Sequence, residues 1–377
     1  MKCYKLNEIE NKRILGRNVQ NADKNESVNL FWAASGLEIN VKAKEVWVTF
    51  TADYSAYEVW VSIFLNDVRI SRFMVEKGEQ KKVCLVRGLN PENENVITIY
   101  KDTQPMPGDS CHSLKINEIM LDDEGVFCKV KPKNVKMEFI GNSITSGEGL
   151  TGSPQQMEWI PALFVGSESY ACEVARKSNA DFSVFSQCGW GLCWGWDGNR
   201  YNNLPSHYEK VCSVMAGDFH KTLGAFEDFD FKNGSDFVII NLGTNDNGAF
   251  FQPAWKDEKT GTEYKLTLEN DKPLQKDKDF IVNAAKNFLT LIRKHNKNAQ
   301  IIWCYGMIKL NIIPECIKNA VEQWSFENGD KNIHILELDS MEDLEKTDAD
   351  KGSRCHPGKK VHKSAAEKLE KIISGLL

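Results

Sequence analysis

The sequence contains no run of apolar residues long enough to span a membrane. Its start, Met1 to Asn11, also lacks the apolar stretch of a secretory signal, so we expect a cytoplasmic protein if this is the native N-terminus. Basic residues are not clustered, because 47 lysines and arginines are interspersed with 53 acidic residues, giving a formal charge of -6. This pattern argues against a nucleic-acid partner, and we expect no membrane partner either.

The cysteines show no spacing that is typical of metal ligands, so we expect no metal and no cofactor. An odd count of 11 without an export signal favours reduced thiols. What the chain does contain is ample material for ordered cores. Its 377 residues, 41% of them hydrophobic, predict two or three domains, and they indicate no oligomeric state.

The N-terminal part consists of short β-rich runs separated by polar turns. No helical period appears among these runs, which therefore predict a β-sandwich over residues 1–131. The runs cover residues 46–50, 57–64, 70–75, 83–86 and 96–100.

Beyond about residue 133, strands alternate with helices. Helical spacing covers residues 169–178 and 280–295, and continuous apolar runs at residues 182–185, 237–242 and 300–305 indicate buried strands. The alternation predicts a three-layer α/β domain with a parallel sheet over residues 135–377, preceded by a short polar linker. Its ligand site should lie at the carboxyl ends of the strands.

The most informative stretch runs from Phe139 to Gly149, where an apolar strand leads into a glycine-rich turn that carries Ser143. The glycines allow a sharp change of direction into a helix whose first N–H groups are unpaired. A developing oxyanion would meet donors there. On its own the stretch is more typical of an ordinary turn with Ser143 as a helix cap.

Three further fragments supply the other parts that a serine nucleophile needs. Gly189 follows the strand at residues 182–185 and would offer its backbone N–H to an oxyanion. Asn245 follows the strand at residues 237–242 and could donate from its side-chain nitrogen. His356 lies in a turn just before an amphipathic helix, which is a suitable position for a general base.

The ordered set Gly-Asn-Ser143, Gly189, Gly-Thr-Asn245-Asp and His356-Pro resembles the four blocks of the SGNH (GDSL-type) hydrolases, over about residues 135 to 377. Within that superfamily, Phe31-Trp-Ala-Ala-Ser-Gly and the stretch around Ser143 resemble carbohydrate esterase family 2. The resemblance implies a jelly-roll β-sandwich followed by an SGNH hydrolase domain. It also implies a serine esterase that removes acetyl groups from xylan or mannan oligosaccharides through an acetyl-enzyme.

This resemblance assigns the nucleophile to Ser143, the base to His356, and the oxyanion hole to Ser143, Gly189 and Asn245. The chain departs from the superfamily pattern in two places, with Asn142 before the serine and Ser353 where an aspartate normally precedes the histidine.

The second departure matters more, because the aspartate fixes the imidazole tautomer and stabilises the imidazolium. An oriented main-chain carbonyl can also fix the tautomer, and family 2 includes members that work with a Ser-His dyad. We therefore expect a dyad, with Asp348 and Asp350 as the nearby carboxylates that could complete a triad.

The segment from residue 188 to 202 is rich in glycine and in aromatic residues, which suit the apolar face of a sugar ring. It predicts an oligosaccharide contact, although any one of these aromatics is equally expected to pack beneath the loop. The candidate substrate-binding residues are Trp190, Trp194, Trp196, Tyr201 and Asn202, with His207 as a further ligand contact. A second long loop, residues 247–278, predicts a lid or rim.

Two other functions remain open from the sequence. One is a different SGNH activity, namely a lipid or thioester hydrolase or an acyltransferase. The other is a non-catalytic carbohydrate-binding protein built on a decayed esterase. The absence of an aspartate at position 353 motivates this alternative.

Overall fold

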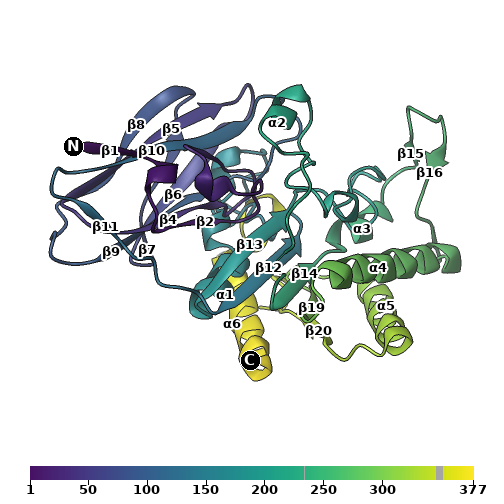
Figure 1. The fold of residues 1–377 in the computed structure, drawn as a ribbon. Coiled ribbons are helices and arrows are strands. Elements are labelled where there is room, and N and C mark those ends of the chain that lie inside the picture. The colour runs from purple at the N-terminus through teal and green to yellow at the C-terminus, as the bar shows by residue number, and fades with distance from the viewer. Residues whose placement is uncertain (233, 345–350) are drawn as a thin grey trace.

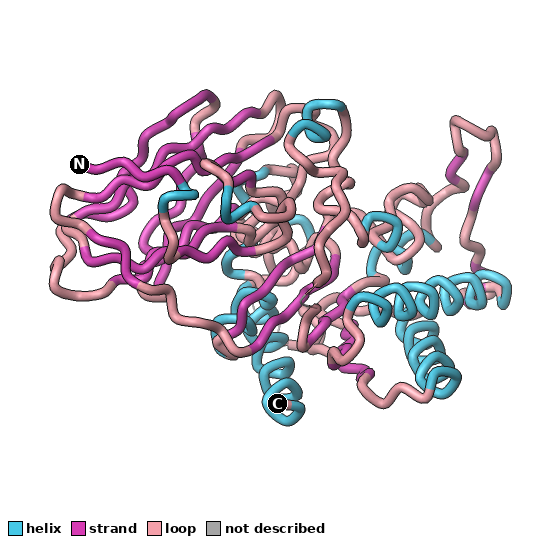
Figure 2. Tube along the Cα trace, viewed as in Figure 1, coloured by secondary structure: helices cyan, strands magenta, loops and turns pink. Residues whose placement is uncertain are grey.

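The computed structural model describes residues 1–232, 234–344 and 351–377. The first eleven strands lie together on one side of the molecule, whereas the longer helices accompany the sheet of the C-terminal part (Figure 1). Figure 2 shows the same division, with strands and loops dominating the N-terminal part. The chain passes between the two parts from Cys128 to Val135.

Two antiparallel sheets make up the N-terminal part. The first contains β1 (Lys2–Lys5), β3 (Val28–Asn29), β5 (Glu45–Asp53), β8 (Gly78–Arg87) and β10 (Ser113–Leu121), in the order β1-β10-β5-β8 with β3 also paired to β10. The second contains β2 (Lys12–Leu15), β4 (Gly36–Lys42), β6 (Val59–Leu65), β7 (Val68–Val75), β9 (Asn95–Lys101) and β11 (Val126–Cys128), in the order β11-β4-β9-β6-β7 with β2 paired to β4.

Alternating apolar residues build the core of this part. In β4, the side chains of Leu37, Ile39 and Val41 are fully buried in a cluster that collects residues from both sheets. Asn66 and Asp67 join β6 to β7 with φ angles of 50° and 66°, as a type I′ hairpin turn requires. The β-rich runs predicted from the sequence overlap β5 to β9.

A five-stranded parallel sheet forms the centre of the C-terminal part, as the sequence predicted. It contains β12 (Val135–Gly141), β13 (Ala180–Ser186), β14 (Phe237–Asn241), β19 (Gln300–Tyr305) and β20 (Ile333–Glu337), in the order β13-β12-β14-β19-β20. Because the chain order reverses between β12 and β14, a crevice is expected outside the carboxyl ends of these two strands.

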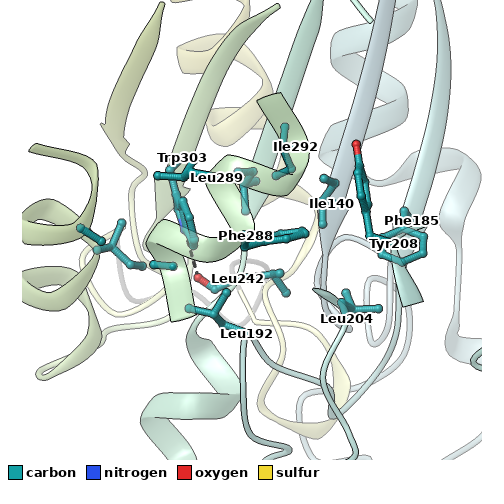
Figure 3. Packing of buried hydrophobic residues seen from close by; sticks show 14 of the residues in the cluster. Ile140, Phe185, Leu192, Leu204, Tyr208, Leu242, Phe288, Leu289, Ile292 and Trp303 are labelled. Carbon is teal, nitrogen blue, oxygen red and sulfur yellow. Dashed lines mark hydrogen bonds between the residues drawn. The ribbon is translucent and has the colours of Figure 1, made fainter. Parts of the chain in front are cut away.

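Helices cover both faces of this sheet, which makes the C-terminal part an α/β unit. The helices are α1 (Tyr170–Lys177), α2 (Asp218–Thr222), α3 (Thr244–Ala249), α4 (Gln275–His295), α5 (Ile313–Asn328) and α6 (Lys359–Leu376). On one face, Phe288 and Ile292 of α4 pack near Ile140 and Trp303 of the sheet (Figure 3). On the other face, α1 and α6 pack against each other and the sheet.

Short elements connect these layers. They are the 3-10 helices η1 (Leu6–Glu8), η2 (Ala22–Lys24), η3 (Pro161–Leu163), η4 (Gly166–Glu168), η5 (Pro205–His207) and η7 (Ser353–Cys355), and the two-residue strands β15 (Trp255–Lys256), β16 (Glu263–Tyr264), β17 (Leu268–Glu269) and β18 (Lys272–Pro273). Within the described ranges, every helix is too short or too polar to cross a bilayer.

A buried ion pair joins the two parts of the chain. Arg17, which follows β2, has no exposed surface and donates to Glu138 of β12 from Nε at 3.0 Å and from a terminal nitrogen at 2.7 Å. Its guanidinium also lies over the rings of Phe185 and Tyr208, at 4.2 and 4.6 Å from their centroids. The N-terminal part is therefore anchored inside the C-terminal core.

A buried histidine on α6 predicts a dependence of stability on pH. His362 is 1% exposed, and its Nδ1 accepts the backbone N–H of Tyr170 at 3.0 Å. Burial, together with the nearby His356, lowers the pKa of His362 to about 3. The folded state therefore binds fewer protons than the unfolded chain between pH 6.5 and 3, and stability should fall as the pH drops through this window.

The full effect is on the order of 5 kcal/mol. His362→Asn keeps an acceptor for the Tyr170 N–H but cannot titrate, so its unfolding free energy should fall less steeply between pH 6.5 and 4. Urea unfolding at several pH values measures the slope, and equal slopes for both proteins would contradict the expectation.

Candidate active site

Ser143 and His356 lie far apart in the sequence but are brought into contact by the fold. Ser143 follows β12, His356 follows η7, and the distance between Ser143 Oγ and His356 Nε2 is 2.9 Å. The other ring nitrogen, Nδ1, lies 2.8 Å from the backbone carbonyl oxygen of Arg354. With Nδ1–H donating to that carbonyl, Nε2 is free to accept the serine proton.

The turn around Ser143 differs in one respect from the sequence prediction. No α-helix begins there, and residues 142–150 form a series of turns in which Ser143 O accepts the N–H of Glu148 at 2.9 Å. The prediction of a helix was wrong because Gly147 and Gly149 have φ angles of 75° and 70°, outside the helical region. Asn142 Oδ1 accepts the backbone N–H of Ile144 at 3.0 Å and so braces the turn.

Glycine is required at position 149 by the approach of the histidine. A Cβ atom built there would lie 2.8 Å from His356 Cβ and 2.4 Å from the carbonyl oxygen of Ser353. On the histidine side, Arg354 and Cys355 have positive φ angles of 54° and 57°, which are uncommon for residues with side chains. This strained turn directs the Arg354 carbonyl toward the imidazole.

No described carboxylate takes the position of the usual aspartate. Ser353 is fully buried, and its hydroxyl donates to the carbonyl of Thr151 at 3.2 Å instead of contacting the imidazole. Asp348 and Asp350, the carboxylates considered from the sequence, lie outside the described residues. The geometry on Nδ1 is therefore that of the expected dyad, with a main-chain carbonyl as the orienting group.

The predicted oxyanion donors lie in segments that follow neighbouring strands. Gln187, at the end of β13, donates its N–H to Gly141 O of β12 at 3.2 Å, which ties the loop carrying Gly189 to the serine turn. Gly189 has a φ of 75°, and a Cβ there would lie 2.9 Å from the Trp196 ring. Asn245, 9% exposed, donates from Nδ2 to Trp190 O at 2.7 Å, which uses one of its two N–H groups.

Two residues that position this loop were missed by the sequence analysis. Gln104 Oε1, from the segment after β9, accepts the backbone N–H of Cys188 at 2.7 Å. Lys101 is 1% exposed and donates to the carbonyls of Phe31, Thr103 and Gln104 at 3.1, 2.6 and 3.0 Å. The N-terminal part therefore holds the residue next to Gly189 in place.

Asp246, next to Asn245, fixes the aromatic loop. Its buried carboxylate accepts the backbone N–H groups of Leu192, Cys193 and Trp194 at 2.8, 2.8 and 2.9 Å. Burial raises the pKa of this carboxyl, and the three N–H donors oppose that rise. The sequence places Asp246 in the Gly-Thr-Asn245-Asp block but gives no partner for its carboxylate.

The candidate substrate-binding residues divide into exposed and buried groups. Trp196 and Tyr201 are 56% and 47% exposed, whereas Trp190 and Asn202 are half-buried. Trp194 is only 4% exposed and packs in the hydrophobic cluster shown in part in Figure 3. Its prediction as a sugar contact was wrong, because its indole lies in the core beneath the loop.

The two remaining candidates from the sequence, His207 and residues 247–278, contact the aromatic loop. His207 Nδ1 lies 2.8 Å from Ser213 Oγ, and its ring packs on Trp190 with centroids 5.1 Å apart. Residues 247–278 contain the two hairpins β15/β16 and β17/β18, the first of which projects from the body of the molecule (Figure 1). The hydroxyl of Tyr201 donates to Asp257 of this segment at 2.9 Å.

Comparison with solved structures identifies the family. The chain is 34% identical to an acetyl xylan esterase from the rumen bacterium Butyrivibrio proteoclasticus, with a TM-score of 0.93 over 100% of this chain and 99% of the other. The chain belongs to carbohydrate esterase family 2. A family 2 esterase from Clostridium thermocellum, solved in complex with cellohexaose, is 22% identical and shares the fold, with a TM-score of 0.77 over 97% of this chain and 98% of that one.

A curated relative extends the comparison of this family 2 chain. The cellulase/esterase CelE of Acetivibrio thermocellus is 24% identical over 352 residues, which is 92% of this chain but 37% of the relative. The chain thus corresponds to about a third of that longer protein. No family model matches the sequence.

Proposed function

We propose that this protein is a serine esterase that removes O-acetyl groups from xylan- or mannan-derived oligosaccharides. The observation that carries the proposal is the 2.9 Å contact between Ser143 Oγ and His356 Nε2, at the carboxyl end of a parallel sheet in a family 2 chain. The alternative activities, a lipase, thioesterase, acyltransferase or decayed binding protein, are not favoured by the comparisons.

In the proposed mechanism, His356 Nε2 accepts the proton of Ser143 while Oγ attacks the acetyl carbonyl carbon. The carbonyl oxygen gains negative charge, which the N–H groups of Ser143 and Gly189 and the free Nδ2–H of Asn245 stabilise. The imidazolium then donates its proton to the departing sugar oxygen. Water, activated by His356, hydrolyses the acetyl-enzyme and restores the serine hydroxyl.

For the sugar, we propose a platform made by Trp196 and Tyr201 beside the half-buried Trp190 and Asn202. The two exposed rings supply flat apolar surface, and the hairpin arm at Asp257 forms the rim of this platform. The relative solved with cellohexaose is consistent with an oligosaccharide substrate.

We further propose that residues 1–131 form a jelly-roll domain and residues 135–377 the hydrolase domain. The support is the strand order, because β3-β10-β5-β8 in one sheet and β4-β9-β6-β7 in the other alternate early and late strands, as in a double Greek key.

Acetate release from acetylated xylan and mannan oligosaccharides tests the function. We expect release from these substrates, with NMR of the products identifying the sugar and the hydroxyl that loses its acetyl group. Aryl acetate and aryl octanoate provide the second arm, in which the acetyl ester should be cleaved much faster. Faster cleavage of the octanoyl ester, or no acetate from any oligosaccharide, would refute the proposal.

Asn245→Ala should lower kcat by about 10²-fold to 10³-fold and leave measurable activity, because only one of three oxyanion donors is lost. Steady-state kinetics with an aryl acetate measures the loss. The matched control is Asn199→Ala in the aromatic loop, whose side chain caps a local turn and should leave kcat within about twofold of the wild type. Equal kcat values for Asn245→Ala and the wild type would remove Asn245 from the oxyanion hole.

A further inference from the structure

A buried carboxylate with no assigned role lies against the Ser143 and His356 pair. Glu148 is 1% exposed, and its Oε2 lies 3.6 Å from His356 Nε2. Its Oε1 lies 3.1 Å from Nε of Arg354. Among the described residues, neither carboxylate oxygen has a hydrogen-bond partner of good geometry. A carboxylate so deeply buried needs a compensating charge or a function.

The surroundings of the imidazole leave Glu148 as the anion that faces it in the described part of the chain. Arg354 contributes a cation from the same turn as His356. His362, from α6, is kept neutral by burial, and its pKa is lowered further by His356. Cys188, from the loop after β13, faces Glu148. Burial, and to a lesser extent the charge of Glu148, raises the pKa of the Cys188 thiol well above its ordinary value.

The usual aspartate of such a site has two tasks, which are to fix the tautomer and to stabilise the imidazolium. Here the carbonyl of Arg354 lies at Nδ1 and can perform the first task. A carbonyl is uncharged, however, and stabilises a full positive charge far less than a carboxylate does. The second task therefore needs another group, and Glu148 is placed at the opposite nitrogen.

We infer that Glu148 is a positioning residue that stabilises the His356 imidazolium from its Nε2 side, in place of the missing aspartate. The inference rests on the proposed esterase function. When Ser143 Oγ bonds to the acetyl carbon, its proton moves to Nε2, and a positive charge appears 3.6 Å from Oε2 of Glu148. The imidazole is neutral before this step, so the attraction strengthens toward the transition state, where it accelerates the reaction.

The test compares Glu148→Gln with the wild type in two titrations. One is the pH dependence of kcat/KM for an aryl acetate, and the other is NMR of the His356 ring without substrate. Because the carboxylate favours the charged imidazole, Glu148→Gln should shift both titration curves to lower pH. The acid limb of kcat/KM should move by the same amount as the NMR titration. We also expect kcat to fall about tenfold at neutral pH with KM nearly unchanged.

Two further variants make the result specific. Arg354→Gln removes the cation but keeps the carbonyl at position 354, so both titration curves should move to higher pH. Glu168→Gln is the matched control, since Glu168 pairs with Arg69 and Lys359, each at 3.3 Å, and should leave both titrations unchanged. If Glu148→Gln fails to fold, Glu148→Asp, which retains the charge, should keep the titration of His356 close to that of the wild type.

Titration curves of Glu148→Gln that are unchanged or shifted to higher pH would overturn the inference. So would a rise in KM at constant kcat, which would indicate a substrate contact. Absence of ester hydrolysis by the wild-type protein would refute the proposed function instead. In that case the NMR titration, which needs no substrate, still decides whether Glu148 and His356 are paired.

Discussion

Ser143→Ala should lower kcat for acetyl ester hydrolysis by about 10⁴-fold to 10⁶-fold. The reason is that the bond from Oγ to the acetyl carbon cannot form, so only the oxyanion donors and substrate binding remain. Acetate release under single-turnover conditions measures the residual rate. A serine-directed phosphonate, which should label the wild type at position 143, provides a readout that does not depend on the choice of sugar.

Matched controls separate chemistry from folding in this experiment. His356→Gln should lose a similar factor, and the double variant should be no worse than either single one, because the two residues act as a unit. Ser153→Ala changes an exposed serine and should keep full activity and labelling. Phosphonate labelling of Ser143→Ala at the wild-type rate would show that another residue is the nucleophile.

Arg17→Met should reduce the free energy of unfolding by about 3–5 kcal/mol. This change leaves the carboxylate of Glu138 in the core without its cation, and it removes the donor of the buried Tyr208 carbonyl, which accepts from Arg17 at 2.5 Å. Urea unfolding followed by tryptophan fluorescence measures the loss. Because the ion pair joins the two parts of the chain, the loss of unfolding free energy should appear in the transition in which both parts unfold together.

An exposed ion pair provides the comparison for Arg17. Arg87, 69% exposed, pairs with Glu45 at 2.9 Å on the surface of the N-terminal sheets, and Arg87→Met should cost less than about 1 kcal/mol. Arg17→Lys should still destabilise, because an ammonium cannot donate through two nitrogens to one carboxylate while covering aromatic rings. Similar losses for Arg17→Met and Arg87→Met would mean that burial of the pair contributes little.

The helices and strands that the sequence predicted are those in which apolar residues follow a regular pattern without interruption. Helical spacing identified α1 and α4, and continuous apolar runs identified β13, β14 and β19. By contrast, β10 was not among the predicted strands. Its pairing with β5 shifts between Ile116 and Glu118, and this bulge interrupts the alternation that reveals a strand.

The candidate site shows the same limit at the level of single residues. Ser143 and His356 were predictable because each follows a strand or precedes a helix in a fixed chain order. Gln104 and Glu148 were not, because no motif or spacing in the sequence indicates that their side chains pair with Cys188 and His356. Only the folded chain brings such pairs together.

Trp194 was predicted as a sugar contact because it lies in the same loop as Trp196, yet the structure buries one and exposes the other. Aromatic composition identifies such a loop, but the side on which each ring lies depends on the backbone bonds made by Asp246.

The hydrogen bond that Cys188 N–H donates to Gln104 Oε1 makes the proposed oxyanion site depend on both parts of the chain. A shortened gene beginning near residue 135 would therefore encode a sheet and its helices without the brace for the loop that holds Gly189. A minimal fragment designed to keep this loop in place therefore has to include the N-terminal strands.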